Sequence, residues 1–332
     1  MDIKLLEKLS NAVSIGHIDS ALKVAESELS KYSEVSRFGE TSLIAKINKG
    51  KDKTLLLDAH IDEVGFIVTK VLGQGFVRVA SVGGNDARIL PATPVVIHGK
   101  EDITAVFAST PPHLAGGDKD VKSLEDILLD TGRKDAENIV SPGDLVTYKT
   151  TFAPLGENVV SGKSLDDRAG VFCLIELAKR IYNKDINCNV TILLSEAEEL
   201  GTRGAVTAAF ALDADEAIAI DVSFGNAPDV SAEHSGKLGG GAMIGISPVL
   251  SGAVTNKIKS IAKEKNIIHQ FEVMGGRTST DADVISLSKS GIPTGLLSIP
   301  LRSMHTPCEV INTKDLESVI SLLEEYVLGG IA

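Results

Sequence analysis

Two adjacent glutamates, Glu198 and Glu199, follow an apolar run and precede a glycine. Like charges side by side beyond a buried strand repel each other unless water or a cation neutralises them. A divalent metal ion would neutralise one carboxylate, and the other would then take a proton from water and return it to a leaving amine. The pattern favours a metal-dependent hydrolytic site over a solvated loop beside Arg203.

Four further side chains are of types that bind divalent ions, namely His60, Asp166, Asp221 and His305. A pair of ions about 3.5 to 4 Å apart needs a bridging carboxylate, terminal imidazole and carboxylate ligands, and a free carboxylate that acts on the bound water. The two histidines, two aspartates and two glutamates together supply each part. Zinc, cobalt and manganese are all compatible with such ligands, and zinc and cobalt suit mixed imidazole and carboxylate ligands best. The set therefore predicts a centre of two divalent metal ions.

Asp62 lies two positions after His60. A metal-bound imidazole usually donates its second N–H to a carboxylate, which fixes the tautomer and the orientation of the ring. We therefore expect Asp62 to orient His60. The alternative is a hydrogen-bonded histidine at the end of a strand.

The other candidates also have ordinary structural uses when each is taken alone. Asp166 would cap the start of a helix, and the neighbouring Asp167 and Arg168 are expected to form a local charge pair. Asp221 would begin a turn after an apolar run, and His305 would be a loop histidine. For these residues, it is the whole set that favours a metal centre.

The elements that must position these residues follow an α/β pattern. Four apolar runs predict buried strands, at 54–59, 190–194, 217–220 and 295–299. Helical periodicity covers 3–32 in two pieces broken near Gly16, begins again just after Asp166, and recurs at 255–265 and 314–327. Each strand is followed by a candidate ligand. Ligands bind at the carboxyl ends of strands in open α/β sheets, so these residues are expected to converge on one rim.

A segment of different composition interrupts this pattern. Residues 73–155 are rich in β-branched residues and in the glycine and proline pairs of turns. Because single cores stop growing at about 250 to 300 residues, a chain of 332 residues is expected to hold two domains. We predict a discontinuous catalytic domain, formed by 1–72 and 156–332, and an inserted β-rich domain at 73–155.

Charge and composition exclude several classes of protein. Lys and Arg total 33 against 45 Asp and Glu, and the net charge of -12 disfavours nucleic acid and anionic membrane surfaces as partners. The N-terminus lacks the apolar core of a signal peptide, and no apolar run approaches the roughly 18 residues of a membrane span. Three scattered cysteines, Cys173, Cys188 and Cys308, indicate a reducing compartment and packing roles. We expect a cytoplasmic protein.

Six motifs in this order resemble the family-42 metallopeptidases, the glutamyl and leucyl aminopeptidases that form tetrahedral particles. They occupy 58–66, 165–170, 198–201, 220–222, 280–282 and 304–307, and the resemblance runs from about residue 40 to the C-terminus. It implies a mixed-sheet α/β catalytic domain of the zinc-aminopeptidase type and an inserted β-rich dimerisation domain. Dimers in this family assemble into a hollow dodecamer that admits peptides. The segment 14–19 departs from the Ser-Gly-x-Glu pattern of the family.

The resemblance also implies a role for each residue. His60 and Asp221 would bind one metal ion, Glu199 and His305 the other, and Asp166 would bridge them. Glu198 would be the general base and acid, and Asp62 the partner of His60. The resulting hypothesis is a two-metal aminopeptidase that hydrolyses N-terminal residues from peptides, through a metal-bound hydroxide prepared by Glu198.

Two alternatives are kept. Some proteins similar to this group are labelled endoglucanases, and paired carboxylates also cleave sugars. Adjacent glutamates in one loop suit one base and one ligand better, and the chain has no Trp for sugar stacking. A non-catalytic, metal-dependent assembly protein would not need the free carboxylate of Glu198. No motif indicates the preferred N-terminal residue, the native metal, or whether the assembled protein is a dimer or a dodecamer.

Overall fold

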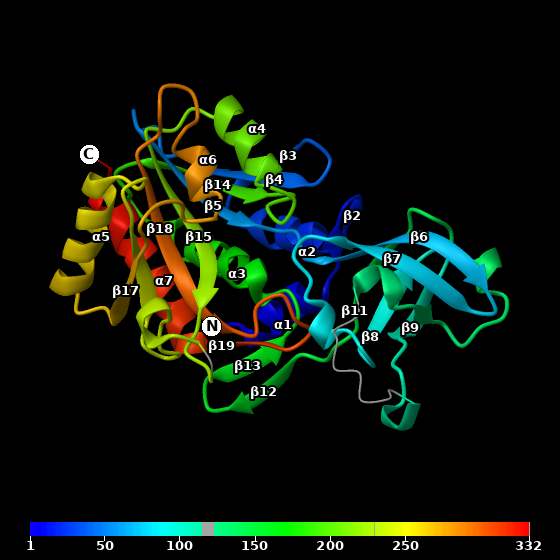
Figure 1. Cartoon of the computed structure of the whole chain (residues 1–332). Coiled ribbons are helices and arrows are strands. Elements are labelled where there is room, and N and C mark those ends of the chain that lie inside the picture. Colours follow the sequence, from blue (N-terminus) through cyan, green and yellow to red (C-terminus); the bar gives the residue numbers. More distant parts are fainter. Residues whose placement is uncertain (115–122, 229, 332) are drawn as a thin grey trace.

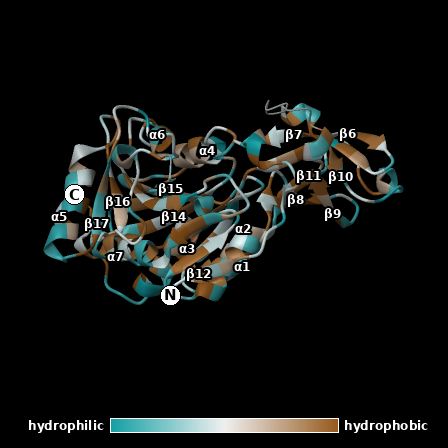
Figure 2. Ribbon diagram, turned by 60° about the horizontal axis from the view of Figure 1, so that its bottom comes forward, coloured by the Kyte–Doolittle hydropathy of each residue, from teal (hydrophilic) through white to brown (hydrophobic). Residues whose placement is uncertain are grey.

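Two lobes of different construction make up the chain (Figure 1). The structure is a computed structural model that describes residues 1–114, 123–228 and 230–331. The larger lobe is a mixed sheet between helices, and the smaller is a closed β-barrel. Hydrophobic residues are concentrated on the strands of both lobes (Figure 2), so each lobe has its own core. This arrangement confirms the mixed α/β fold class with a small β-rich domain.

The large sheet is built around four parallel strands. They are β14 (Asn189–Ser195), β5 (Thr54–His60), β15 (Glu216–Phe224) and β18 (Thr294–Arg302), adjacent in this order. The four predicted strands are therefore confirmed. The predicted end of the third strand was wrong, because β15 stays paired with β18 to Phe224 and Asp221 lies inside the strand.

Shorter strands extend the sheet on both sides. On the β14 side lie β4 (Ser42–Ile47) and β3 (Glu34–Phe38), both antiparallel. Beyond β18 lie β19 (Glu309–Asn312), β13 (Val159–Gly162) and β12 (Ala153–Gly156), and also β16 (Ala242–Ile246) with β17 (His269–Val273). A separate two-stranded ribbon is formed by β1 (Ser14–Ile15) and β2 (Ile18–Asp19).

Helices cover both faces of the sheet. One face carries α1 (Ile3–Asn11), α2 (Ser20–Leu29), α3 (Leu165–Ile181), α5 (Gly252–Glu264) and α7 (Thr313–Gly329), whose apolar residues share one core with the strands. The other face carries α4 (Arg203–Ala211) and the short α6 (Ala282–Ile285). The helical segments predicted at the N-terminus, after Asp166, and near residues 255 and 314 are confirmed.

Strand alternation decides on which face the candidate ligands lie. Leu57 packs in the core with the five helices, whereas Leu56 packs with α4. Successive side chains of a strand point to opposite faces, so His60 lies on the α4–α6 side at the end of β5. Ala217 also packs with α4, and Asp221 therefore shares that side. Because both faces are covered, most residues of the four parallel strands are apolar.

The small lobe is a six-stranded closed barrel. Its strands, in spatial order, are β10 (Leu129–Asp130), β7 (Phe76–Val82), β6 (Gly65–Gly73), β11 (Leu145–Tyr148), β8 (Pro94–His98) and β9 (Asp102–Phe107). Phe66 packs edge-on against Phe107 and Tyr148 in its core. All of the first barrel strand except Gly73 lies within the segment that we assigned to the catalytic domain, and β11 ends at Tyr148. The role of the insert in dimerisation stays a prediction.

Two further expectations concern single features. None of the helices in the described ranges combines the length and the apolar character that crossing a membrane requires. Cys173 and Cys188 are buried free thiols, as expected of packing residues. Cys308 is exposed, so its predicted packing role was wrong. It lies in the loop between β18 and β19.

Candidate metal centre

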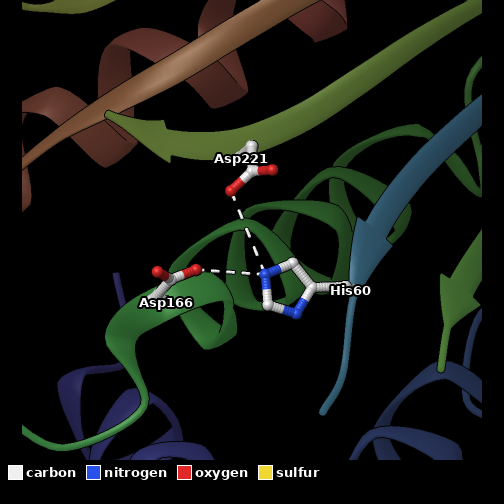
Figure 3. A group of neighbouring side chains, drawn as sticks. All are labelled: His60, Asp166 and Asp221. Atoms are coloured by element: carbon white, nitrogen blue, oxygen red, sulfur yellow. Dashed lines mark hydrogen bonds and ion pairs between the residues drawn. The ribbon is translucent and has the colours of Figure 1, made fainter. Parts of the chain in front are cut away.

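The first group of candidate ligands joins three elements of the large lobe. His60 ends β5, Asp166 lies in the first turn of α3, and Asp221 lies in β15 (Figure 3). His60 Nε2 is 3.0 Å from Asp166 Oδ1 and 4.0 Å from Asp221 Oδ1, and all three residues are buried. Their donor atoms lie within 4.8 Å of one another, a spacing that suits one metal ion.

The second group uses the other oxygen of Asp166. His305 Nε2 lies 3.2 Å from Asp166 Oδ2 and 3.1 Å from Glu199 Oε1. Glu199 follows β14, and His305 follows β18. The two groups therefore share one carboxylate, with an imidazole at each of its oxygens. This is the arrangement that a bridging ligand would have.

Backbone geometry helps Asp166 to reach both histidines. Asp166 and Asp167 depart from helical backbone angles inside the first turn of α3. The carboxylate of Asp167 instead accepts the N–H of Gly170 at 3.0 Å. The expected charge pair between Asp167 and Arg168 was wrong. Arg168 is fully buried, donates to the carbonyl of Ile61, and lies 3.5 Å from a carboxylate oxygen of Glu63.

The imidazoles carry the positive charge of the metal-free site. Burial by itself would lower the pKa of His305, but its ion pairs with Asp166 and Glu199 raise it to about 11. Burial likewise opposes the charge on His60, and its pairs with Asp166 and Asp62 raise its pKa well above the usual range. Both imidazoles are therefore protonated at neutral pH. A bound metal ion would displace one proton from each imidazole.

The two protonated imidazoles do not neutralise all of the carboxylates around them. Burial raises the pKa of Asp221 well above its usual range and that of Glu199 above its ordinary value. Burial also raises the pKa of Glu198 to about 8, and nearby carboxylates add to the shift. A buried cluster of this kind favours divalent cations. The donor set, two imidazoles and three carboxylates in two linked groups, fits a pair of divalent ions.

Asp62 supports two parts of the site at once. One of its oxygens lies 3.4 Å from His60 Nδ1, as expected of a carboxylate that orients a ligand. The same side chain accepts the backbone N–H groups of Glu198, at 3.0 Å, and Glu199, at 3.3 Å. Asp62 thus fixes the end of β5 against the loop after β14, a second role that the sequence pattern did not indicate.

Glu309 is a supporting residue that the sequence analysis missed. Its carboxylate accepts the backbone N–H groups of Leu165 at 2.7 Å, Asp166 at 3.2 Å and His305 at 2.9 Å. The side chain is buried, and burial raises its pKa well above the usual range. Glu309 therefore joins the shared carboxylate to the second histidine. The only signal in the sequence was an acid four residues after His305.

The barrel contributes one contact to the centre. His305 Nδ1 donates to the carbonyl of Gly84, at 2.8 Å, which leaves Nε2 facing Asp166 and Glu199. A Cβ at Gly84 would lie 2.9 Å from that nitrogen, so only glycine permits this approach. In the sequence, the glycine pairs of 73–155 indicate only turns.

A cavity of about 470 Å³ opens beside the two ligand groups. Four of the acidic candidates line it, together with His305 and residues of β15, β17, β18 and the loop after β17. Among the described residues, no hydrogen bond or ion pair to the carboxylate of Glu198 is recorded, and this residue also lines the cavity. The geometry thus places a free acid and two ligand groups at one opening.

The family match and the named relatives show that the chain is a metal-dependent aminopeptidase. The family model of M42 glutamyl aminopeptidases matches residues 41–322, and the chain belongs to this family. The lysyl aminopeptidase of Pyrococcus furiosus is 30% identical over 286 residues, which cover 82% of this chain and 81% of that protein. The resemblance stated from the motifs is confirmed.

Several solved structures share the whole fold. The TET aminopeptidase of Thaumarchaeota archaeon SCGC AB-539-E09 has a TM-score of 0.93 at 26% identity, covering 98% of this chain and 95% of that one. The Pyrococcus horikoshii TET1 peptidase, which can assemble into a tetrahedron or a large octahedral shell, has a TM-score of 0.87 at 29% identity, covering 98% and 99%. A Thermotoga maritima protein named as an endoglucanase has a TM-score of 0.79 at 25% identity, covering 98% and 97%.

Proposed function

We propose that this chain is a two-metal aminopeptidase that removes N-terminal residues from peptides. The observation that carries the proposal is the sharing of Asp166 by two ligand groups, one at each carboxylate oxygen. His60 and Asp221 would hold one divalent ion, and Glu199 and His305 would hold the other. Zinc or cobalt suits these ligands best, and manganese is also compatible.

Glu198 is the general base and acid of the proposed reaction. Two bound ions would polarise the scissile carbonyl and acidify a water molecule. Glu198, anchored through its backbone N–H to Asp62, takes a proton from the attacking water and returns it to the leaving amine. Its raised pKa, about 8 in the metal-free protein, favours the second of these transfers, and nearby cations would favour the first.

The supporting contacts keep the ligands in place during turnover. Asp62 orients His60 and the glutamate loop, and Glu309 holds the backbone of Asp166 and His305. Ligand groups that are fixed in advance need little reorganisation when charge develops on the substrate. These four contacts join four separate segments of the chain, so the site depends on the folded large lobe.

Hydrolysis of aminoacyl-anilides tests this function directly. The metal-free protein should be inactive, and addition of cobalt, zinc or manganese should restore cleavage of substrates with a free N-terminal amine. The same substrates with an acetylated amine serve as the control and should resist cleavage. If added metal restored cleavage of neither series, the aminopeptidase proposal would be wrong.

The similar Thermotoga maritima protein named as an endoglucanase makes a glycosidase the alternative function. In glycosidases, two carboxyl groups flank the bond at about 5 to 9.5 Å and no metal pair is needed. Here the acids are paired with imidazoles around one shared aspartate, and Phe224 is the only Phe, Tyr or Trp among the described residues that line the cavity. Soluble cellulose derivatives, tested with the same metal-loaded protein, should therefore remain uncleaved.

We also propose that the chain forms a homo-oligomer in which the barrel joins two subunits. The support is the assembly of the Pyrococcus horikoshii TET1 peptidase and the shared fold. Mass measurement by light scattering would separate a dimer from a particle of twelve subunits. A monomer at micromolar concentration would contradict the proposal.

The side chain preferred at the N-terminus does not follow from the comparisons. The family model is named for glutamyl substrates, and the Pyrococcus furiosus relative for lysyl substrates. These side chains have opposite charges. The preference must therefore be sought in the cavity of this chain.

A further inference from the structure

One acidic residue of the cavity is neither in the ligand groups nor the proposed general base. Glu272, on β17, lines the same cavity as Asp221 and Glu198. Its carboxylate accepts the hydroxyl of Ser298 at 2.7 Å and the hydroxyl of Ser223. Both serines are buried, so the acid is fixed in position. The proposed metal ligands and the proposed general base are other residues, so the proposed reaction gives Glu272 no role.

Sheet register places this acid beside the metal centre. Ser298 of β18 pairs with Asp221 of β15, and Ser223 lies two residues after Asp221. Paired residues and residues two apart share one face of a sheet, so both serines point to the side that holds the ligands. Two residues along a strand span about 6.6 Å, and Glu272 lies within reach of both hydroxyls. Glu272 therefore lies beside the metal centre, on the same side of the sheet as Asp221.

Within the described part of the chain, the carboxylate of Glu272 has no cationic partner. Among the residues that the structure describes, no ion pair to Glu272 is recorded. Arg277 lines the same cavity, but it is exposed and no ion pair to it is recorded within these residues either. A fixed anion with hydroxyl donors on one side and an open cavity on the other attracts a cationic ligand group.

Apolar side chains form another part of the cavity lining. Met274, Leu296 and Met304 contribute to it. Leu296 is buried, and Met274 packs against the small core cluster around it. Lysine and arginine side chains combine an apolar stem with a charged end, and they bind where an apolar wall leads to an acid.

We infer that this cavity binds a basic side chain, lysine or arginine, of the substrate's N-terminal residue, with Glu272 as the residue that selects it. The inference deepens the proposed aminopeptidase function and rests on it. Two other assignments compete with it. In the first, Arg277 selects an acidic side chain of the substrate. In the second, Glu272 binds the α-amine that all substrates share.

The test compares lysine with norleucine, which has the same four-carbon stem without the ammonium group. The metal-loaded protein is assayed with lysyl-, norleucyl- and glutamyl-anilides, and the binding of free lysine and norleucine is measured by calorimetry. The variants are Glu272→Gln and Arg277→Gln. Glu264→Gln, an exposed change of the same kind on α5, is the matched control.

The expected result is a preference in kcat/KM for lysyl over norleucyl substrate of about 10- to 100-fold, the usual size of a charge-assisted hydrogen bond. Glu272→Gln should bring this ratio near one and weaken lysine binding by a similar factor. The control should leave both ratios as in the wild type. Arg277→Gln should not lower the lysyl ratio.

Three results would overturn the inference. One is a lysyl to norleucyl ratio that Glu272→Gln does not change, and another is an equal loss for both substrates, which would assign Glu272 to the α-amine. The third is a preference for glutamyl substrate that Arg277→Gln abolishes. Cleavage of no substrate at all would contradict the proposed function instead, and lysine and norleucine binding would then still decide the pocket assignment.

Discussion

The metal centre and the side-chain pocket share one cavity but differ in how they are held. Asp62 and Glu309 tie the ligand segments together, and Gly84 orients His305 from the barrel. On the pocket side, Glu272 depends on two serine hydroxyls, and Arg277 is exposed without a recorded partner among the described residues. The chemistry is thus fixed by many contacts, whereas the preference for a side chain depends on few residues. Changes in the first region should abolish turnover, and changes in the second should redirect it.

The largest effect is expected from Glu198→Gln. The amide keeps the size of the side chain but cannot take a proton, so kcat should fall by about 10²- to 10⁴-fold. Metal content, measured by atomic emission, should stay at the wild-type level because Glu198 is not in either ligand group. Loss of metal together with activity would show that Glu198 is a ligand and not the base.

Glu309→Gln should damage the centre without touching a ligand side chain. Glutamine has one oxygen in place of two, so the three backbone N–H groups of Leu165, Asp166 and His305 lose at least one acceptor. Metal affinity should fall by about 10- to 100-fold, the usual cost of losing such support. Glu137→Gln, an exposed change in the barrel, is the control. Unchanged affinity would mean that the ligands hold their places unaided.

Metal binding should strengthen as pH rises. His305, with a pKa of about 11, and His60 are protonated at neutral pH, and each must lose a proton to bind metal. Apparent affinity should rise by about tenfold per pH unit for each displaced proton. Calorimetry in buffers of different ionisation enthalpy would count the released protons. An affinity independent of pH between 6 and 8 would contradict the protonated state.

The stability of the metal-free fold should change in the opposite direction. The pKa of His305 in the folded protein lies above the ordinary value of 6.5, so its contribution is complete below pH 6.5 and is lost as pH rises through about 11. Burial raises the pKa of Asp221, whose contribution is also lost with rising pH. The Tm of metal-free protein should therefore fall from pH 7 to pH 10. The metal-loaded protein, scanned in parallel, should show a smaller decline.

Gly84→Ala tests the contact between the barrel and the centre. The added Cβ would lie 2.9 Å from His305 Nδ1, so the imidazole or the loop must move. One of the two metal ions, the one held by Glu199 and His305, should bind about tenfold more weakly. Gly156→Ala, where nothing lies near the added carbon, is the control. A titration identical to wild type would show that His305 does not need this carbonyl.

The smallest effect is expected from Ser298→Ala on the pocket side. The change removes one of the two hydroxyls that fix Glu272, and a single hydrogen bond contributes about 0.5 to 1.5 kcal/mol. The lysyl to norleucyl ratio in kcat/KM should fall by about threefold to tenfold, with metal content unchanged. A loss of metal would instead show that the two regions are coupled through the Asp221 register pair.

Much of the large lobe and of the ligand set was predictable from the sequence. Runs of apolar residues identify buried strands because both faces of the sheet are covered, and His60, Glu198 and Glu199 lie just beyond or at the ends of such runs. The end of β15 was misjudged because the polar Asp221 interrupts the run, although strand pairing continues to Phe224. The barrel was predictable as β-rich, but its first strand resembles the preceding segment, and closure depends on pairing between distant strands.

By itself, the sequence determined the strands, the amphipathic helices, and the types and order of the candidate ligands, because local periodicity and composition encode these directly. Only the tertiary structure decided which residues support the metal ligands and which residue is placed to select the substrate side chain. Glu309 reaches Leu165 across 144 positions, Gly84 reaches His305 across 221, and Glu272 reaches Ser223 across 49. Such contacts leave no mark in a local pattern, since they arise only when the sheet register and the barrel loop bring distant segments together.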